Sequence, residues 1–110
     1  MIVIMHEAAK LFRALGDPTR LAVFECVARR EMTVSELTNR FDVSQPAISQ
    51  HLAALRVSGL VSQRKDGRFV YYRADPAGMK PLIHWLRHYQ AFWKERMPRL
   101  RALLKEMKDE

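Results

Sequence analysis

The sequence predicts a mainly helical α+β fold with one small β-hairpin, built as a single domain over residues 1–110. Three observations lead to this expectation. Apolar residues recur at helical spacing along most of the chain. Residues that favour helix N-termini stand directly before several of these segments. One Asp-Gly pair, Asp66–Gly67, separates two short runs of the kind that form paired strands.

Two helices are expected on either side of Gly16. Residues 6–15 place apolar side chains at helical spacing, and the glycine that follows favours a helix C-terminus. Asp17 then serves as an N-terminal cap, and Pro18 takes the first helical position, where a missing N–H costs no hydrogen bond. We expect this second helix to end near residues 29–31.

Two shorter helices should follow, joined by a tight turn at 42–43. Thr33 stands three residues before Glu36, which is the spacing of a capping box and predicts a helix over 34–41. Ser44 is placed to cap the next helix.

The helix after Ser44 has two unlike faces. Its apolar face carries Ile48, Leu52 and Leu55 at helical spacing. Its other face carries polar side chains that a purely structural helix does not need: Gln45, Ser49, Gln50 and Arg56. Gly59 is expected to end the helix.

The hairpin is expected over residues 60–73, with Asp66–Gly67 as its two-residue turn. Side chains alternate along the second strand, so one of two pairs should pack on the helices: Val70 and Tyr72, or Phe69 and Tyr71. Three basic side chains are expected around the tip, where they could straddle a phosphate backbone: Arg64, Lys65 and Arg68.

A last helical region is expected from Met79 to Met107, with a kink or break near Arg96 caused by Pro98. Its apolar stripe is too long for one small core to bury, which favours packing against a second copy of the chain. The side chains expected at that interface are Leu11, Leu82, Leu86, Tyr89, Trp93 and Leu100.

Charge is unevenly distributed along the chain, which has a net charge of +7. Residues 1–43 balance six basic against six acidic side chains, whereas residues 44–73 carry five basic side chains and one acidic one. Such a concentration favours a polyanionic partner. With no apolar run of about 18 residues and a single cysteine, we expect a cytoplasmic protein without disulfides or a membrane segment.

Two short helices joined by a tight turn and followed by a basic hairpin form a winged helix-turn-helix, an arrangement that binds duplex DNA. Its second helix can enter the major groove and reach base edges. No nucleophile–base pair or paired carboxylates accompany a substrate pocket in the sequence, so we do not expect an enzyme.

Three stretches resemble the ArsR/SmtB family of bacterial winged-helix repressors: LFRALGDPTRLAVFECV, SQPAISQHLAALRVSGLV and RKDGRFVYYR. The resemblance covers about residues 5–75. It implies a homodimer that represses by occupying a promoter and often releases DNA on binding a metal ion or another signal. Its recognition-helix positions correspond to Ser44, Gln45, Pro46, Ser49, Gln50 and His51, and its basic wing residue to Arg68.

The chain also departs from that family. The third helix, where soft-metal sensors place cysteines, reads SELTNRF and offers no thiol. His84 and His88 could clamp a metal ion as a pair four residues apart, or could be ordinary surface residues. We expect no metal, no cofactor and a core position for Cys26, and the effector stays open. His51 could contact phosphate, or be buried and donate to a backbone carbonyl.

The prediction is therefore a homodimeric, sequence-specific binder of double-stranded DNA that represses transcription at an inverted repeat. The DNA-binding core is expected at about 17–75 and the dimerisation helices at about 5–15 and 77–108. Three alternatives stay open: a winged-helix module that docks proteins or RNA, a basic ribosome-associated factor, and a repressor that senses metal through His84 and His88.

Overall fold

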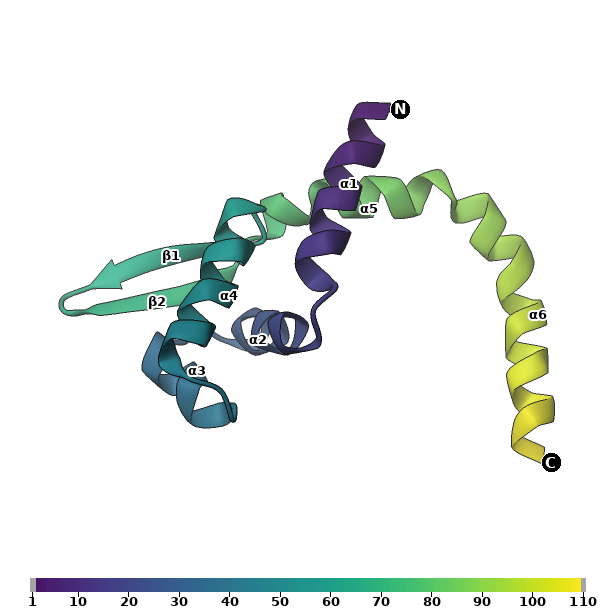
Figure 1. Ribbon diagram of the computed structural model, residues 1–110. Coiled ribbons are helices and arrows are strands. Elements are labelled where there is room, and N and C mark those ends of the chain that lie inside the picture. The colour runs from purple at the N-terminus through teal and green to yellow at the C-terminus, as the bar shows by residue number, and fades with distance from the viewer. Residues whose placement is uncertain (1, 110) are drawn as a thin grey trace.

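The computed structural model describes the backbone of residues 2–109, and it describes their side chains except at positions 2–5, 91, 93, 108 and 109. The chain forms, in order, α1 (Ile2–Leu15), α2 (Pro18–Arg29), α3 (Val34–Arg40), α4 (Gln45–Val57), β1 (Val61–Asp66), β2 (Phe69–Ala74), a 3₁₀ turn (Pro76–Met79), α5 (Lys80–His88) and α6 (Gln90–Asp109). Figure 1 shows the mainly helical fold with its hairpin, which confirms the predicted fold class.

The predicted helix caps are confirmed. The Asp17 carboxylate accepts a hydrogen bond from the Arg20 backbone N–H at 2.8 Å. Thr33 and Glu36 form the expected capping box. The Ser44 hydroxyl accepts from the Ala47 N–H at 3.2 Å. These bonds satisfy N–H groups that have no partner inside the helix, so local sequence fixes where α2, α3 and α4 begin.

The first helix is longer than expected, because it begins at Ile2 instead of residue 6. Nothing at residues 2–5 breaks or caps a helix, so the helical conformation continues through them. Gly59 ends α4 as predicted. Its φ is +86°, a conformation that residues with a side chain rarely adopt.

One core lies among α1, α2, α3, α4, β1 and α5. The apolar face of α4 is at its centre, with no more than 1% of Ile48, Leu52 or Leu55 exposed. Their neighbours include Leu11, Val23, Val27, Met32, Leu37, Leu60, Val61 and Leu82. Because this whole face of α4 is buried, only its opposite face can meet a partner.

The hairpin turn differs by one residue from the prediction. Asp66 pairs with Phe69, so the two-residue turn is Gly67–Arg68 and Asp66 belongs to β1. Gly67 has a φ of +62°, and no other residue type in the described backbone has a positive φ. Glycine at the first central position is the pattern of a type II′ turn, which matches strand twist. The prediction failed because Asp-Gly also signals a type I′ turn, which would start one residue earlier.

The hairpin packs on the helices through the face of β2 that carries the Tyr72 side chain. The backbones of Met32 and Tyr72 exchange two hydrogen bonds, at 3.0 and 2.8 Å. Tyr72 packs against the core, whereas Phe69 is 58% exposed. Of the two alternating pairs, the one with Tyr72 therefore faces the helices.

The C-terminal helical region breaks at Tyr89 and not near Arg96. Tyr89 leaves the helical conformation, with φ −103° and ψ 18°, and its ring packs 4.9 Å from that of Trp85. Pro98 lies inside α6, which continues through it. Proline removes one backbone donor, and α6 continues in spite of that loss, so Pro98 does not set the break.

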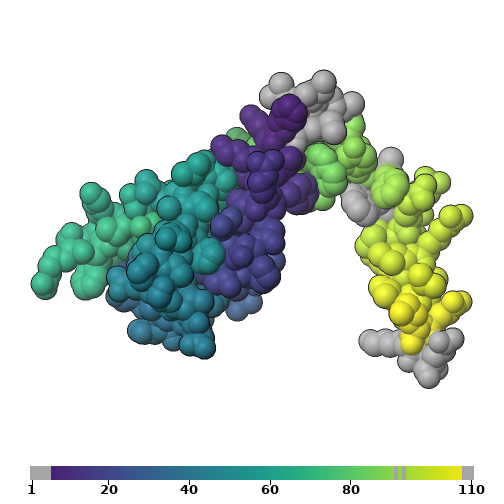
Figure 2. All heavy atoms as spheres, viewed as in Figure 1, coloured from purple at the N-terminus to yellow at the C-terminus, as the bar shows by residue number. Residues whose placement is uncertain are grey.

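Beyond the break, α6 extends away from the body as an arm (Figures 1 and 2). The radius of gyration is 17.3 Å, against about 13 Å for a compact domain of this length. The core therefore contributes little to the stability of α6, and an isolated helix gains little from its own hydrogen bonds.

Candidate nucleic-acid interface

The outward face of α4 carries most of the side chains predicted to contact bases. Gln45, Pro46, Ser49 and Gln50 are all exposed. Ser44 is exposed too, but its hydroxyl caps the helix, so its first task is structural. The helix therefore presents an amide-rich surface on a rigid element whose other side is fixed in the core.

His51 occupies a different environment from its neighbours on α4. Its side chain is only 18% exposed, and its Nδ1 accepts a hydrogen bond from the Arg20 Nε at 3.4 Å. The Asp17 carboxylate lies 3.9 Å from the same Nδ1. The bond that His51 makes is thus to a side chain of α2 and not to a backbone carbonyl. It leaves Nε2 as the protonated nitrogen of the neutral ring.

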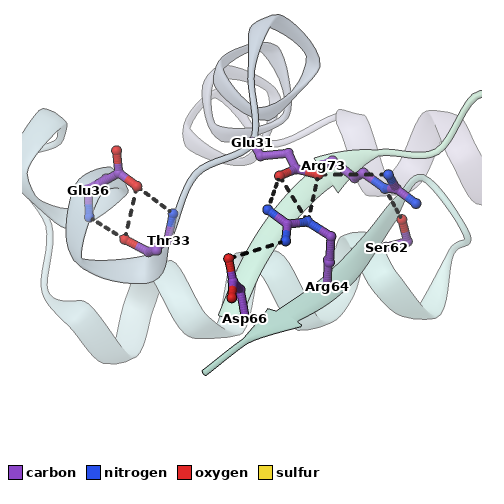
Figure 3. A network of polar contacts seen from close by, with 7 residues as sticks. All are labelled: Glu31, Thr33, Glu36, Ser62, Arg64, Asp66 and Arg73. Atoms are coloured by element: carbon purple, nitrogen blue, oxygen red, sulfur yellow. Dashed lines mark hydrogen bonds and ion pairs between the residues drawn. The ribbon is translucent and has the colours of Figure 1, made fainter. Parts of the chain in front are cut away.

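An ion-pair network attaches the hairpin to the end of α2 (Figure 3). The Glu31 carboxylate accepts hydrogen bonds from the Arg64 Nη2 at 2.7 Å and Nε at 3.2 Å. The Arg73 guanidinium lies 3.7 Å from the same carboxylate. Arg64 also lies 4.9 Å from the Tyr71 ring centroid. Glu31 therefore holds cations from both strands.

This network changes what Arg64 can do. The hydrogen bond from Arg64 lowers the pKa of Glu31, and the bond to Glu31 raises the pKa of Arg64. Both side chains are thus charged and paired at neutral pH. The sequence placed Arg64 at the hairpin tip, but it pairs with Tyr71, two positions from the last pair of the ladder. Sequence reasoning missed Glu31 because it lies 33 residues from Arg64.

Three other predicted cations are exposed: Arg56, Lys65 and Arg68. Arg68 lies in the turn itself, and Lys65 lies one pair further back. Within the described side chains, none of these three cations forms an ion pair. They are the predicted wing and backbone residues that stay available to a phosphate.

The side chains predicted for an interface between copies divide into two groups. Leu86, Tyr89 and Leu100 are exposed by 43%, 37% and 45%, so they could meet a partner. Leu11 and Leu82 are 2% and 8% exposed within a single chain, so they belong to the core and the expectation for them was wrong. The side chain of Trp93 lies outside the described residues.

Further exposed apolar side chains extend this surface. Leu104 and Met107 belong to the apolar stripe that the sequence predicted for the C-terminal helix, whereas the sequence did not single out four others for an interface: Phe12, Ile83, Phe92 and Leu103. The Phe12 ring contacts Trp85 edge to face at 5.3 Å, which links α1 to α5. Helical periodicity identified Leu104 and Met107, whereas the exposure of Phe12 depends on how α1 packs on α5.

The histidine and cysteine candidates do not gather into a cluster. His84 and His88 are exposed on α5, and no group of three potential metal ligands occurs in the part of the chain that the structure describes. Cys26 is half-buried at the edge of the core, beside Arg29 and Arg40. It was expected among buried side chains, but α2 turns this position partly outward.

None of the helices over residues 2–109 is long and apolar enough to cross a membrane.

Comparisons with known proteins point to one group. The profile of bacterial regulatory proteins of the arsR family matches residues 17–63. The transcriptional regulator KmtR of Mycobacterium tuberculosis is 40% identical over 74 residues, which cover 67% of this chain but only 57% of KmtR. The transcriptional activator HlyU of Vibrio cholerae is 38% identical over 80 residues, covering 73% of this chain and 74% of HlyU.

Among solved structures, an ArsR-like transcriptional regulator from Rhodococcus sp. RHA1 is similar over 90% of this chain and 93% of its own, with a TM-score of 0.72 and 34% identity. The likeness thus includes helices outside the matched profile.

Proposed function

Because the chain belongs to the arsR family of bacterial regulatory proteins, a family of transcriptional regulators and not of enzymes, we propose that it represses transcription as a homodimer bound to an inverted repeat in duplex DNA. One observation carries the proposal. The exposed polar face of α4 lies beside a hairpin whose outer end bears unpaired cations. The face of α4 can read bases and the hairpin can bind phosphate, and both belong to the same folded domain.

Base reading is assigned to Gln45, Ser49 and Gln50. An α-helix about 10–12 Å across fits a major groove about 12 Å wide. The side-chain amide of glutamine can donate from its NH₂ group to N7 of adenine while its Oε1 accepts from the N6 amino group, which makes it suited to bidentate recognition. The buried face of α4 holds these amides at fixed positions, and preorganisation limits the entropy lost on binding. Specificity should therefore come from this face.

Phosphate binding is assigned to Lys65 and Arg68 at the end of the hairpin and to Arg56 in the last turn of α4. Phosphate contacts fix the register of the protein on the duplex and supply much of its affinity, without reading sequence. His51 adds a possible Nε2–H donor held in place by Arg20. Pro46 contributes by fixing the start of the helix.

Dimer formation is assigned to the exposed apolar side chains of α5 and α6. A soluble chain of this size does not leave such a stripe in water, and the extended α6 has little of its own core to pack on. A two-fold axis would place two copies of α4 about 34 Å apart, one turn of DNA. On this proposal residues 17–75 bind DNA, and α5 and α6 form most of the interface with a contribution from α1.

Genomic footprinting of the tagged protein tests the proposed function. We expect protection of an inverted repeat, with half-sites one helical turn apart, in a small number of promoters. Deletion of the gene should raise transcription from those promoters. Protection spread evenly over the genome would contradict a specific regulator and favour a general polyanion binder.

A further inference from the structure

A second cationic surface lies beside α4, where α1 and the start of α2 approach it. A shallow groove of about 360 Å³ runs there. Its apolar lining includes Ala14 of α1 and Ala53 and Val57 of α4, and Lys10 and Arg13 of α1 line it too. Arg20 completes the lining.

No acidic side chain lines this groove. Lys10 and Arg13 are exposed, and neither forms an ion pair with any side chain described. Arg20 is held in place, because its Nη1 donates to the Ala14 carbonyl at 3.3 Å and its Nε to His51. The nearby Asp17 carboxylate is engaged by the Arg20 backbone N–H. Three positive charges therefore act together on whatever enters the groove.

The groove continues the exposed face of α4. Ala53 and Val57 follow Ser49 at steps of four residues, so all three lie on one side of the helix. The N-terminal residues of a recognition helix contact base edges, and its later turns pass closer to the DNA backbone. In Figure 1 the hairpin and α1 lie on opposite sides of α4. The groove thus adjoins the part of α4 where phosphates of the strand away from the wing would pass.

We infer that this groove binds the sugar-phosphate backbone on the side of α4 opposite the hairpin, with Lys10, Arg13 and Arg20 as the contacting cations. The inference rests on the proposed function, since it extends the same DNA complex. Small ligands are mostly enclosed by their pockets, but this groove is open along its length and suits an extended polyanion. Its apolar side chains can meet deoxyribose carbons while its cations meet phosphate oxygens.

The test compares a Lys10→Ala, Arg13→Ala double variant with wild type on a duplex of about 30 base pairs that spans both half-sites. The duplex carries the site that wild type selects from random DNA. Affinity is measured by fluorescence anisotropy over a range of salt concentrations. Each phosphate contact contributes about 0.9 to the slope of log affinity against log salt. Because a dimer carries two such grooves, we expect the double variant to lose about 3.6 from that slope, two contacts in each protomer.

An Arg29→Ala, Lys80→Ala variant is the matched control, because both side chains are exposed and lie outside the groove and the hairpin. It should keep the wild-type slope. Ethylation interference locates the contacts: the groove variant should lose phosphates other than those that Arg68→Ala loses. Sedimentation velocity and a thermal melt should show unchanged mass and stability.

An unchanged slope and interference pattern in the groove variant, with wild type still bound, would overturn this inference alone. A loss of dimer mass in that variant would overturn it too, because the groove would then belong to an interface between copies. Failure of wild type to bind any duplex would instead reject the proposed function from which the inference starts.

Discussion

The two sides of α4 hold their positive charges in different ways. On the hairpin side, Arg64 and Arg73 are bound to Glu31, which leaves Lys65 and Arg68 unpaired. On the α1 side, the groove presents cations with no acid in its lining. The charge count along the chain suggested that the hairpin side would be the more positive of the two. Residues 44–73 have an excess of basic side chains, whereas residues 1–43 have none. Availability of a cation depends on which acids the fold brings to it.

The acids of the first 43 residues explain this difference. Glu31 is bound by the two hairpin arginines, and Glu36 is bound by Arg30 and the Thr33 backbone. These two acids pair with cations of the hairpin and of the α2–α3 junction, and neither pairs with a cation of α1. A sequence segment with no net charge can therefore present a strongly positive surface.

The largest expected effect comes from deleting α5 and α6, which we propose hold two copies of the chain together. Truncation after Asp75 deletes α5 and α6 and should leave a monomeric or poorly soluble domain. Operator affinity should fall about 10²-fold or more, because two linked half-sites bind far more tightly than one. Sedimentation velocity and anisotropy measure these two outcomes.

A point variant separates assembly from stability, because truncation also removes Leu82 from the core. Leu100→Glu changes only an exposed position and should weaken the dimer while leaving the fold intact. A monodisperse monomer of the full chain at micromolar concentration would contradict the proposed interface.

The next largest effect concerns α4 itself. Gln50→Ala and Gln45→Ala should each weaken operator binding by about 1–3 kcal/mol, because each removes a pair of hydrogen bonds to a base. Binding to random duplex should hardly change, since phosphate contacts are untouched. Anisotropy at one fixed salt concentration measures both. Equal losses on the two duplexes would count against base reading.

A smaller effect distinguishes the two kinds of hairpin arginine. Arg68→Ala should lower the salt slope by about one contact per protomer on any duplex, because its guanidinium is free to bind phosphate. Arg64→Ala should change the slope less, because Glu31 already pairs that charge. Glu31→Gln should then raise the slope in the wild-type background by releasing both arginines. Identical slopes for the Arg64 and Arg68 variants would contradict the proposal that Glu31 keeps Arg64 from binding phosphate.

The smallest expected effect is that of zinc. His84 and His88 supply two ligands on one helix, whereas zinc sites take about four. We therefore expect no release of the operator complex at physiological zinc concentrations. Zinc-driven release in wild type that disappears in a His84→Ala, His88→Ala variant would establish a histidine sensor, with the second copy supplying the other ligands.

Local features of this fold could be predicted from the sequence, because their causes are local. Capping residues fixed the starts of three helices, and helical spacing identified the buried face of α4. The features that escaped prediction depend on distant partners. Glu31 meets Arg64 only after the chain folds, and Leu11 and Leu82 join the core through the crossing of α1 and α5.

The central claim is that the exposed face of α4 reads base sequence, and selection from a pool of random duplexes tests it most directly. Wild type and Gln50→Ala would each be carried through the same rounds of binding and sequencing. We predict that wild type enriches one inverted repeat with half-sites about one turn apart, and that Gln50→Ala relaxes one position in each half-site. A wild-type pool with no enriched sequence, despite tight and salt-sensitive binding, would contradict the claim.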